Sequence, residues 1–195
     1  MNISYLVKIF KMKICIFCGS KLGFSEDVKK DIIVFCELAS NYGFDLVFGG
    51  SDFGTMGLVA DIFRKNGRKV IGIRPNIFIK NETYLKSKTE FVLTKNISER
   101  KLKMLEISDV IVAFPGGIGT LDEITEAHLL KSVEGNAKMV AILNSQNFFE
   151  GLILQYDTMK RYGYTKEKHS ENIFIEKNPE KLFAAIIKYC SAMLQ

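Results

Sequence analysis

The chain has 195 residues, of which 47% are hydrophobic and 25% charged, and its net charge is +5. These proportions are typical of one globular domain whose hydrophobic core is large enough to be stable without disulfide bonds. A mild positive charge suits an anionic ligand, but solvated lysine faces are its commoner cause, so we expect no nucleic-acid partner.

The N-terminus carries a short apolar patch that Lys8 and Lys11 interrupt. It lacks a long apolar stretch and a small-residue cleavage site, and no window approaches the ~20 apolar residues of a membrane span. We therefore expect a cytoplasmic protein with no membrane partner. Residues 1–11 are expected to be an N-terminal extension of a single domain over 12–195, and either Met1 or Met12 could be the start site.

From residue 12 onward, apolar runs typical of strands alternate with segments of helical periodicity. Strands are expected at 13–20, 44–50, 68–75, 109–114, 138–144 and 172–177. Helices are expected at 26–43, 55–67, 97–108, 120–133, 148–163 and 178–194. The segment 76–95 is more polar and predicts no regular structure. Such alternation favours parallel pairing through right-handed crossovers, and the nearly continuous apolar strands indicate a sheet covered on both faces. The predicted fold class is α/β: a single doubly wound, Rossmann-like domain with a mostly parallel sheet flanked by helices.

Cys15 and Cys18 form a C-x-x-C pair, which in other contexts indicates redox chemistry or half of a metal site. Here the pair lies in an apolar strand, where residues three apart point to opposite faces. No second pair stands at a metal-ligand spacing. We therefore expect reduced core cysteines, and neither a metal nor a redox cofactor.

Three of the expected strands end in loops of small residues, at 18–20, 49–57 and 115–120. In a doubly wound sheet, ligands bind beyond the carboxyl ends of the strands. The clearest loop is PGGIGT, where backbone amides and the dipole of the following helix could hold a phosphate. The amides concerned are those of Gly116, Gly117, Gly119 and Thr120. A tight strand-to-helix turn that binds nothing is the alternative.

Two acids follow this loop, Asp122 and Glu123. Consecutive residues lie about 100° apart on a helix, so we expect only one of them to face the pocket. The other would be a charge stabilised by the helix dipole, and the residues alone do not decide which is which. Upstream, Arg100 and Lys101 form a basic pair of the kind that is usually solvated. A function becomes credible if their helix packs against the same edge of the sheet.

At this point the sequence resembles a known family. PGGIGTLDE matches the PGGxGTxxE signature of the LONELY GUY family, formerly labelled lysine decarboxylases, and ERK at 99–101 matches its upstream Arg-Lys pair. FCGS, DLVFGG, MGLVAD and KVIGIRP resemble other blocks of the family in the same order, so the resemblance covers about residues 12–188. It implies a Rossmann-like homodimer without a cofactor. The implied activity is hydrolysis of the N-glycosidic bond of a nucleoside 5′-monophosphate, such as an N6-prenylated AMP, to free base and ribose 5-phosphate.

The resemblance also implies roles for individual residues. Glu123 and Arg100 would be catalytic, which leaves Asp122 as a first-turn charge. The implied substrate-binding residues are Ser20, Gly50, Met56, Glu82, Lys101, Gly116, Gly117, Ile118, Gly119 and Thr120.

The chain departs from the family pattern at Ser51, at Thr55 and over 129–139, and it has no tryptophan. These departures leave the preferred base open. A carrier of a nucleotide or of the molybdenum cofactor, with the same fold and no turnover, is the alternative function. A passive carrier has no need of the Arg100 and Glu123 pair. An amino-acid decarboxylase would need pyridoxal phosphate on a lysine, for which the sequence offers no local case.

Overall fold

Seven parallel strands form one sheet in the part of the chain that the structure, a computed structural model, describes. The described residues are 12–76, 89–134, 138–165 and 172–193, so the expected extension at 1–11 lies outside them. The strands are β1 (Lys13–Phe17), β2 (Asp45–Phe48), β3 (Val70–Pro75), β4 (Thr89–Thr94), β5 (Val110–Ala113), β6 (Met139–Leu143) and β7 (Ile173–Glu176). Their order across the sheet is β4-β3-β2-β1-β5-β6-β7. The chain therefore reverses its direction of travel between β1 and β5, which is where such sheets bind ligands.

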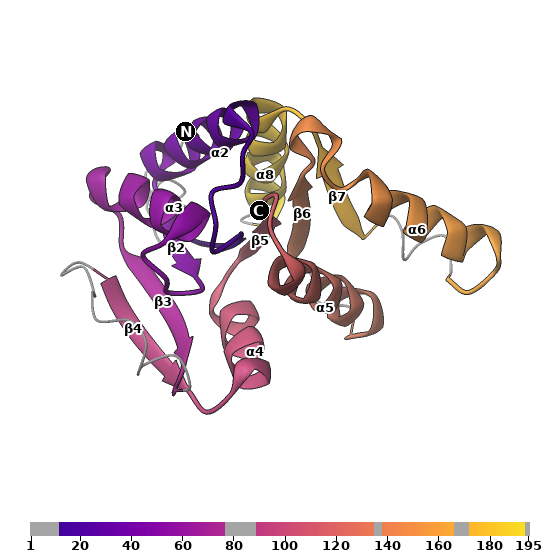
Figure 1. The fold of residues 1–195 in the computed structure, drawn as a ribbon, viewed down its shortest axis with the longest axis horizontal. Helices are drawn as coiled ribbons and strands as arrows, with labels where there is room; N and C mark the ends of the chain where they lie inside the picture. The colour runs from indigo at the N-terminus through magenta and orange to yellow at the C-terminus, as the bar shows by residue number, and fades with distance from the viewer. Residues whose placement is uncertain (1–11, 77–88, 135–137, 166–171, 194–195) are drawn as a thin grey trace.

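Helices cover both faces of the sheet (Figure 1). They are α2 (Glu26–Tyr42), α3 (Gly54–Lys65), α4 (Ile97–Ile107), α5 (Ile118–Glu134), α6 (Glu150–Arg161) and α8 (Pro179–Met193). One core cluster joins α2, α3 and α8 to the sheet, and a second joins α4 and α5 to its other face. This arrangement confirms the predicted doubly wound, Rossmann-like α/β fold. Among the described residues, no helix combines the length and the apolar character that crossing a membrane requires.

The two strand cysteines follow the expected alternation. Cys15 belongs to the core cluster under α4 and α5, whereas Cys18 belongs to the cluster under α2, α3 and α8. Both are buried free thiols. Burial raises the pKa of both thiols well above the ordinary value, which leaves them uncharged and unreactive at neutral pH.

The structure differs from the sequence prediction in three segments. The segment 76–95, for which no regular structure was predicted, contains β4, an edge strand with only one fully buried residue. An edge strand is open to solvent, so it lacks the apolar run that reveals an inner strand. Helix α5 begins at Ile118, two residues before the predicted start. Helix α6 begins at Glu150 after a short 3-10 turn at Ser145–Asn147.

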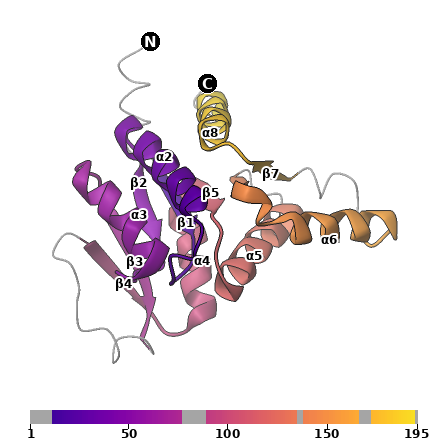
Figure 2. The same ribbon diagram turned by 45° about the horizontal axis from the view of Figure 1, so that its top comes forward.

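Helix α6 projects away from the rest of the domain (Figures 1 and 2). None of its residues is buried, although Leu154 and Met159 lie on its surface. It is amphipathic in sequence but contributes little to the core of this chain.

Candidate active site

A cavity of about 770 Å³ opens where the strand order reverses. Its walls come from the loop after β1, the loop after β2, the end of β3, the start of α4 and the segment from Pro115 to Glu123. A volume of this size is typical of a site for a small molecule. The three glycine-containing loops that the sequence singled out thus meet at one site.

The loop between β5 and α5 presents open backbone to this cavity. A Cβ atom built on Gly117 or Gly119 would meet nothing within 4 Å, and both residues line the cavity. Neither has a positive φ, so glycine here provides space rather than an unusual backbone conformation. The early start of α5 places Gly119 and Thr120 in its first turn, where amides lack partners within the helix.

Gly116 serves a different purpose from its neighbours. A Cβ atom at this position would collide with the side chain of Thr120 and would lie 2.9 Å from the backbone nitrogen of Gly19. The loops after β1 and β5 therefore touch at Gly116, and the buried Thr120 packs under that contact. This close approach holds the open glycines in place.

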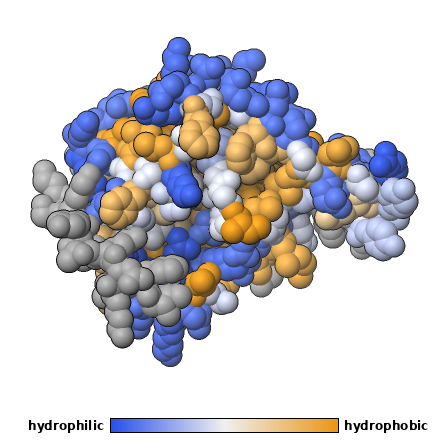
Figure 3. All heavy atoms as spheres, viewed as in Figure 1, coloured by the Kyte–Doolittle hydropathy of each residue, from blue (hydrophilic) through white to orange (hydrophobic). Residues whose placement is uncertain are grey.

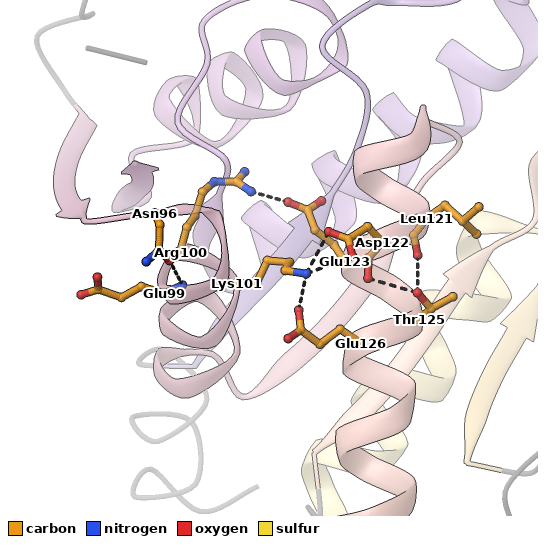
Figure 4. A network of polar contacts seen from close by, with 9 residues as sticks. All are labelled: Asn96, Glu99, Arg100, Lys101, Leu121, Asp122, Glu123, Thr125 and Glu126. Atoms are coloured by element: carbon orange, nitrogen blue, oxygen red, sulfur yellow. Dashed lines mark hydrogen bonds and ion pairs between the residues drawn. The ribbon is translucent and has the colours of Figure 1, made fainter. Parts of the chain in front are cut away.

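Arg100 and Glu123 form an ion pair in the cavity wall (Figure 4). Arg100 Nη1 lies 2.6 Å from Glu123 Oε1, and the two side chains are 13% and 8% exposed. Arg100 Nε also donates to the carbonyl oxygen of Ile73 at 2.9 Å, which fixes the guanidinium against β3. Burial raises the pKa of Glu123, and the adjacent Arg100 opposes that rise.

Gly49 makes room for this arrangement. A Cβ atom on Gly49 would overlap Arg100 Nη2 and lie 2.8 Å from Met56 Sδ. Gly50 has φ +80° and lies against the side chain of Arg74. The double glycine after β2 therefore allows two arginine side chains to cross the carboxyl end of that strand.

Lys101 connects α4 to α5 beside the catalytic candidates (Figure 4). Its Nζ atom donates to both carboxylate oxygens of Asp122 at 2.9 Å and lies 2.8 Å from Glu126 Oε2. Burial lowers the pKa of Lys101, but the carboxylates of Glu126 and Asp122 outweigh it and the pKa is raised. Because α4 packs against β1, β2 and β3, the Arg100-Lys101 pair lies at the switch point rather than in solvent.

The expectation that only one of the consecutive acids would face the pocket is wrong. Asp122 and Glu123 both line the cavity, but the side chain of Asp122 is 53% exposed and that of Glu123 only 8%. Asp122 lies at the rim and Glu123 in the wall. Asp122 is also not a first-turn residue, because α5 starts earlier than predicted and Asp122 falls in its second turn.

Comparisons with known proteins decide the family. Residues 56–186 match the family described as "Possible lysine decarboxylase". A cytokinin riboside 5′-monophosphate phosphoribohydrolase of Arabidopsis thaliana is 31% identical over 152 residues, which cover 78% of this chain and 71% of that protein. A probable enzyme of the same name from Oryza sativa subsp. japonica is 28% identical over 177 residues, or 91% of this chain and 72% of that protein.

The chain belongs to the LONELY GUY, or lysine decarboxylase-like, family. The resemblance seen in the sequence is thereby confirmed. Among solved structures, the molybdenum cofactor carrier protein of Chlamydomonas reinhardtii has a TM-score of 0.68 at 20% identity, covering 93% of this chain and 99% of that one. The molybdenum cofactor binding protein of Rippkaea orientalis has a TM-score of 0.66 at 22% identity, covering 94% and 98%. These two likenesses show a shared fold.

Most of the substrate-binding residues implied by the family line the cavity. They are Ser20, Met56, Lys101, Gly116, Gly117, Ile118, Gly119 and Thr120. Gly50 does not line it, although its neighbours Gly49 and Ser51 do. Glu82 lies outside the described residues.

Arg74 is a cavity residue that neither the sequence reasoning nor the family resemblance singled out. It is 5% exposed and lines the cavity at the end of β3. The one available signal was a charged residue in the otherwise apolar strand VIGIRP. Within the described residues, no cluster of His, Cys, Asp or Glu side chains could hold a metal ion.

Proposed function

We propose that the protein hydrolyses the N-glycosidic bond of a nucleoside 5′-monophosphate, releasing the free base and ribose 5-phosphate. The observation that supports this proposal is the Arg100–Glu123 ion pair of 2.6 Å. The pair lies in the cavity wall beside the open glycines of the 115–120 loop. The names of the family relatives suggest AMP or an N6-modified AMP as substrates with which to begin.

The 5′-phosphate would bind at the start of α5. Gly117 and Gly119 leave the backbone open to a ligand, and the unpaired amides and positive end of a helix dipole favour an anion there. The hydroxyl group of Thr120 and the ammonium group of Lys101 lie in the same wall. Phosphate binding would position the ribose over Glu123.

Glycosidic cleavage builds positive charge on the ribose as the bond from C1′ to the base nitrogen breaks. A carboxylate beside C1′ stabilises that charge and accepts a proton from the attacking water, whose oxygen forms the new bond to C1′. Glu123 would play this part, and the departing base would take up a proton in exchange for the one that Glu123 accepts from the water, so that the two protons balance. Arg100 would orient the carboxylate through their hydrogen bond. The raised pKa of Glu123 makes it a better proton acceptor than an ordinary carboxylate.

The test is to incubate the purified protein with AMP, IMP, CMP and isopentenyl-AMP and to measure free base and ribose 5-phosphate. We expect release from at least one nucleotide, with a loss of about 100-fold or more in Glu123→Gln and in Arg100→Ala. Glu106→Gln is the matched control, because Glu106 is an exposed acid of α4 outside the cavity. Hydrolysis by Glu123→Gln at the wild-type rate would overturn the assignment. Nucleotide binding without cleavage would favour a carrier role instead.

The protein is also proposed to act as a homodimer through α5 and α6. Leu129, Val133 and Leu154 on these helices, and Tyr162 just after α6, are 59–72% exposed. The space-filling view shows apolar side chains over this part of the molecule (Figure 3). Exposed apolar side chains that gather on one part of a molecule mark an interface, and the proposed partner is a second copy of this chain.

A further inference from the structure

Lys21 is a cation in the cavity wall that the proposed mechanism does not use. It belongs to the loop after β1, lines the cavity and is exposed. In the part of the chain that the structure describes, no carboxylate pairs with its ammonium group. Its charge is therefore available to an anionic ligand.

The other cations of the cavity wall already have partners. Arg100 pairs with Glu123, and Lys101 lies between two carboxylates (Figure 4). Arg74 also has an interaction partner. Because one ammonium group faces two carboxylates, the contacts around Lys101 carry a net negative charge. A phosphate that binds beside them needs a further cation to offset this repulsion.

The loop that carries Lys21 touches the proposed phosphate site. A Cβ atom on Gly116 would lie 2.9 Å from the backbone nitrogen of Gly19, so the loop after β1 lies against the PGGIGT loop. Lys21 follows Gly19 by two residues. From that position, the flexible four-carbon stem of a lysine can bring its ammonium group to a phosphate at Gly117.

Thr55 fixes the backbone of this loop. Its side chain is buried, and its Oγ1 atom donates to the carbonyl oxygen of Lys21 at 3.1 Å. A Cβ atom on Gly54 would collide with the peptide that joins Ser20 to Lys21, so the start of α3 packs directly on that peptide. Thr55 is also one of the departures from the family pattern, and its hydroxyl group supplies the hydrogen bond.

We propose that Lys21 binds the 5′-phosphate of the substrate and that Thr55 is a positioning residue that holds Lys21 for this contact. A lysine ammonium group has three donors and a full charge, and its hydrogen bonds to phosphate oxygens are among the strong ones. The ligand recognised in this way is a phosphate monoester, whereas a nucleoside without the phosphate gains nothing from Lys21. The inference rests on the proposed function for the place of the phosphate, but not for its hydrolysis.

The experiment compares ligands with and without a phosphate. Calorimetry in the Glu123→Gln background, which should not consume the nucleotide, measures the affinity for AMP, ribose 5-phosphate and adenosine. Lys21→Met should weaken the binding of AMP and ribose 5-phosphate by about tenfold and that of adenosine by less than about twofold. Lys21→Arg keeps the charge and should retain most of the affinity. Lys29→Met is the matched control, because Lys29 pairs with Glu26 on α2 and lies outside the cavity.

A double-mutant cycle tests the role of Thr55. Thr55→Val removes the hydroxyl group and keeps the shape of the side chain. It should weaken the binding of ribose 5-phosphate by about threefold where Lys21 is present. In Lys21→Met it should have no effect, because a positioning residue acts only through the group that it positions. An equal loss in both backgrounds would show a merely structural role and would overturn this part of the proposal.

The same measurements separate this inference from the proposed function. Unchanged affinity for ribose 5-phosphate in Lys21→Met, or an equal loss for adenosine, would overturn the role of Lys21 even if the wild type hydrolyses AMP. Binding of ribose 5-phosphate that depends on Lys21 would support the role even if no nucleotide is cleaved.

Discussion

At the scale of single residues, the site depends on a carboxylate that is buried and still close to a cation. Burial raises the pKa of Glu123, and Arg100 at 2.6 Å opposes this rise without cancelling it. The protein thus carries an ionisable group that is easier to protonate in the folded chain than in the unfolded one. That difference connects the candidate chemistry to stability.

This difference predicts how stability depends on pH. Because the folded-state pKa of Glu123 is raised above its ordinary value of 4.5, its contribution to stability is full below 4.5 and is lost as pH rises through the raised pKa. Glu123→Gln has no such titration. The free energy of unfolding of the wild type relative to Glu123→Gln should therefore increase as pH is lowered from neutrality toward 4.5. Urea denaturation of both proteins across this range measures it, and a constant difference would contradict a raised pKa.

The open glycines give a second prediction at this scale. Gly117→Ala adds a methyl group where nothing lies within 4 Å, so the free energy of unfolding should change by less than about 0.5 kcal/mol. The methyl group would occupy the space that a phosphate must enter, and nucleotide affinity should fall by about tenfold or more. Calorimetry and thermal unfolding measure the two effects. Gly151→Ala on α6 is the control, since its Cβ atom also meets nothing and it lies outside the cavity. Unchanged affinity in Gly117→Ala would show that the phosphate does not bind at this loop.

At the scale of elements, Lys101 of α4 connects this helix to α5 through two ion pairs. Its side chain is 12% exposed and lies between Asp122 and Glu126. The neighbouring Arg100–Glu123 pair joins the same two helices. The geometry of the candidate site and the packing of α4 and α5 are therefore supported by adjacent contacts, so a substitution in one contact should also alter the other.

We predict that Lys101→Met lowers the free energy of unfolding by about 1–2 kcal/mol, because it leaves the buried Glu126 Oε2 atom without its cation. Adding Glu126→Gln removes the stranded charge and should restore part of the loss. A double-mutant cycle by urea denaturation measures the coupling, expected at about 1 kcal/mol. Strictly additive effects would show that the two side chains act independently.

At the scale of the whole molecule, α6 is an extension that the rest of the chain covers only in part, through Leu152 and Tyr156. It projects from the domain in both ribbon views (Figures 1 and 2) and has no buried residue. Leu129 and Val133 of α5 and Leu154 of α6 are exposed apolar side chains, which favour an interface where they gather. A second copy would bury that surface.

The proposed dimer predicts a change of mass on substitution. The wild type should sediment as a dimer at micromolar concentration, and Leu154→Glu should sediment as a monomer because a charge would be buried in the contact. Leu93→Glu on β4, at the edge strand on the far side of the sheet, is the control. Leu93 is 56% exposed and Leu154 64%, so the two changes are comparable. A monomeric wild type would contradict the proposal.

Much of the fold could be predicted from local pattern. Inner strands such as Val110–Ala113 are continuous apolar runs, and α8 begins at Pro179 with Asn178 just before it, a local signal of a helix start. The edge strand β4 could not be predicted in this way, because its identity depends on pairing with β3 rather than on its own residues. The start of α5 was predicted two residues too late, because the glycine-rich sequence of its first turn lacks the pattern of a helix.

By itself, the sequence determined the α/β class, the three glycine loops and, through the family signature, the candidates Arg100 and Glu123. Only the tertiary structure decided that these two side chains, 23 residues apart, bond directly, that Lys101 is shared between Asp122 and Glu126, and that Arg74 reaches the same cavity. The physical reason is one of range. Period and turn chemistry are properties of neighbouring residues, whereas a hydrogen bond between two elements depends on how the sheet orders and packs them.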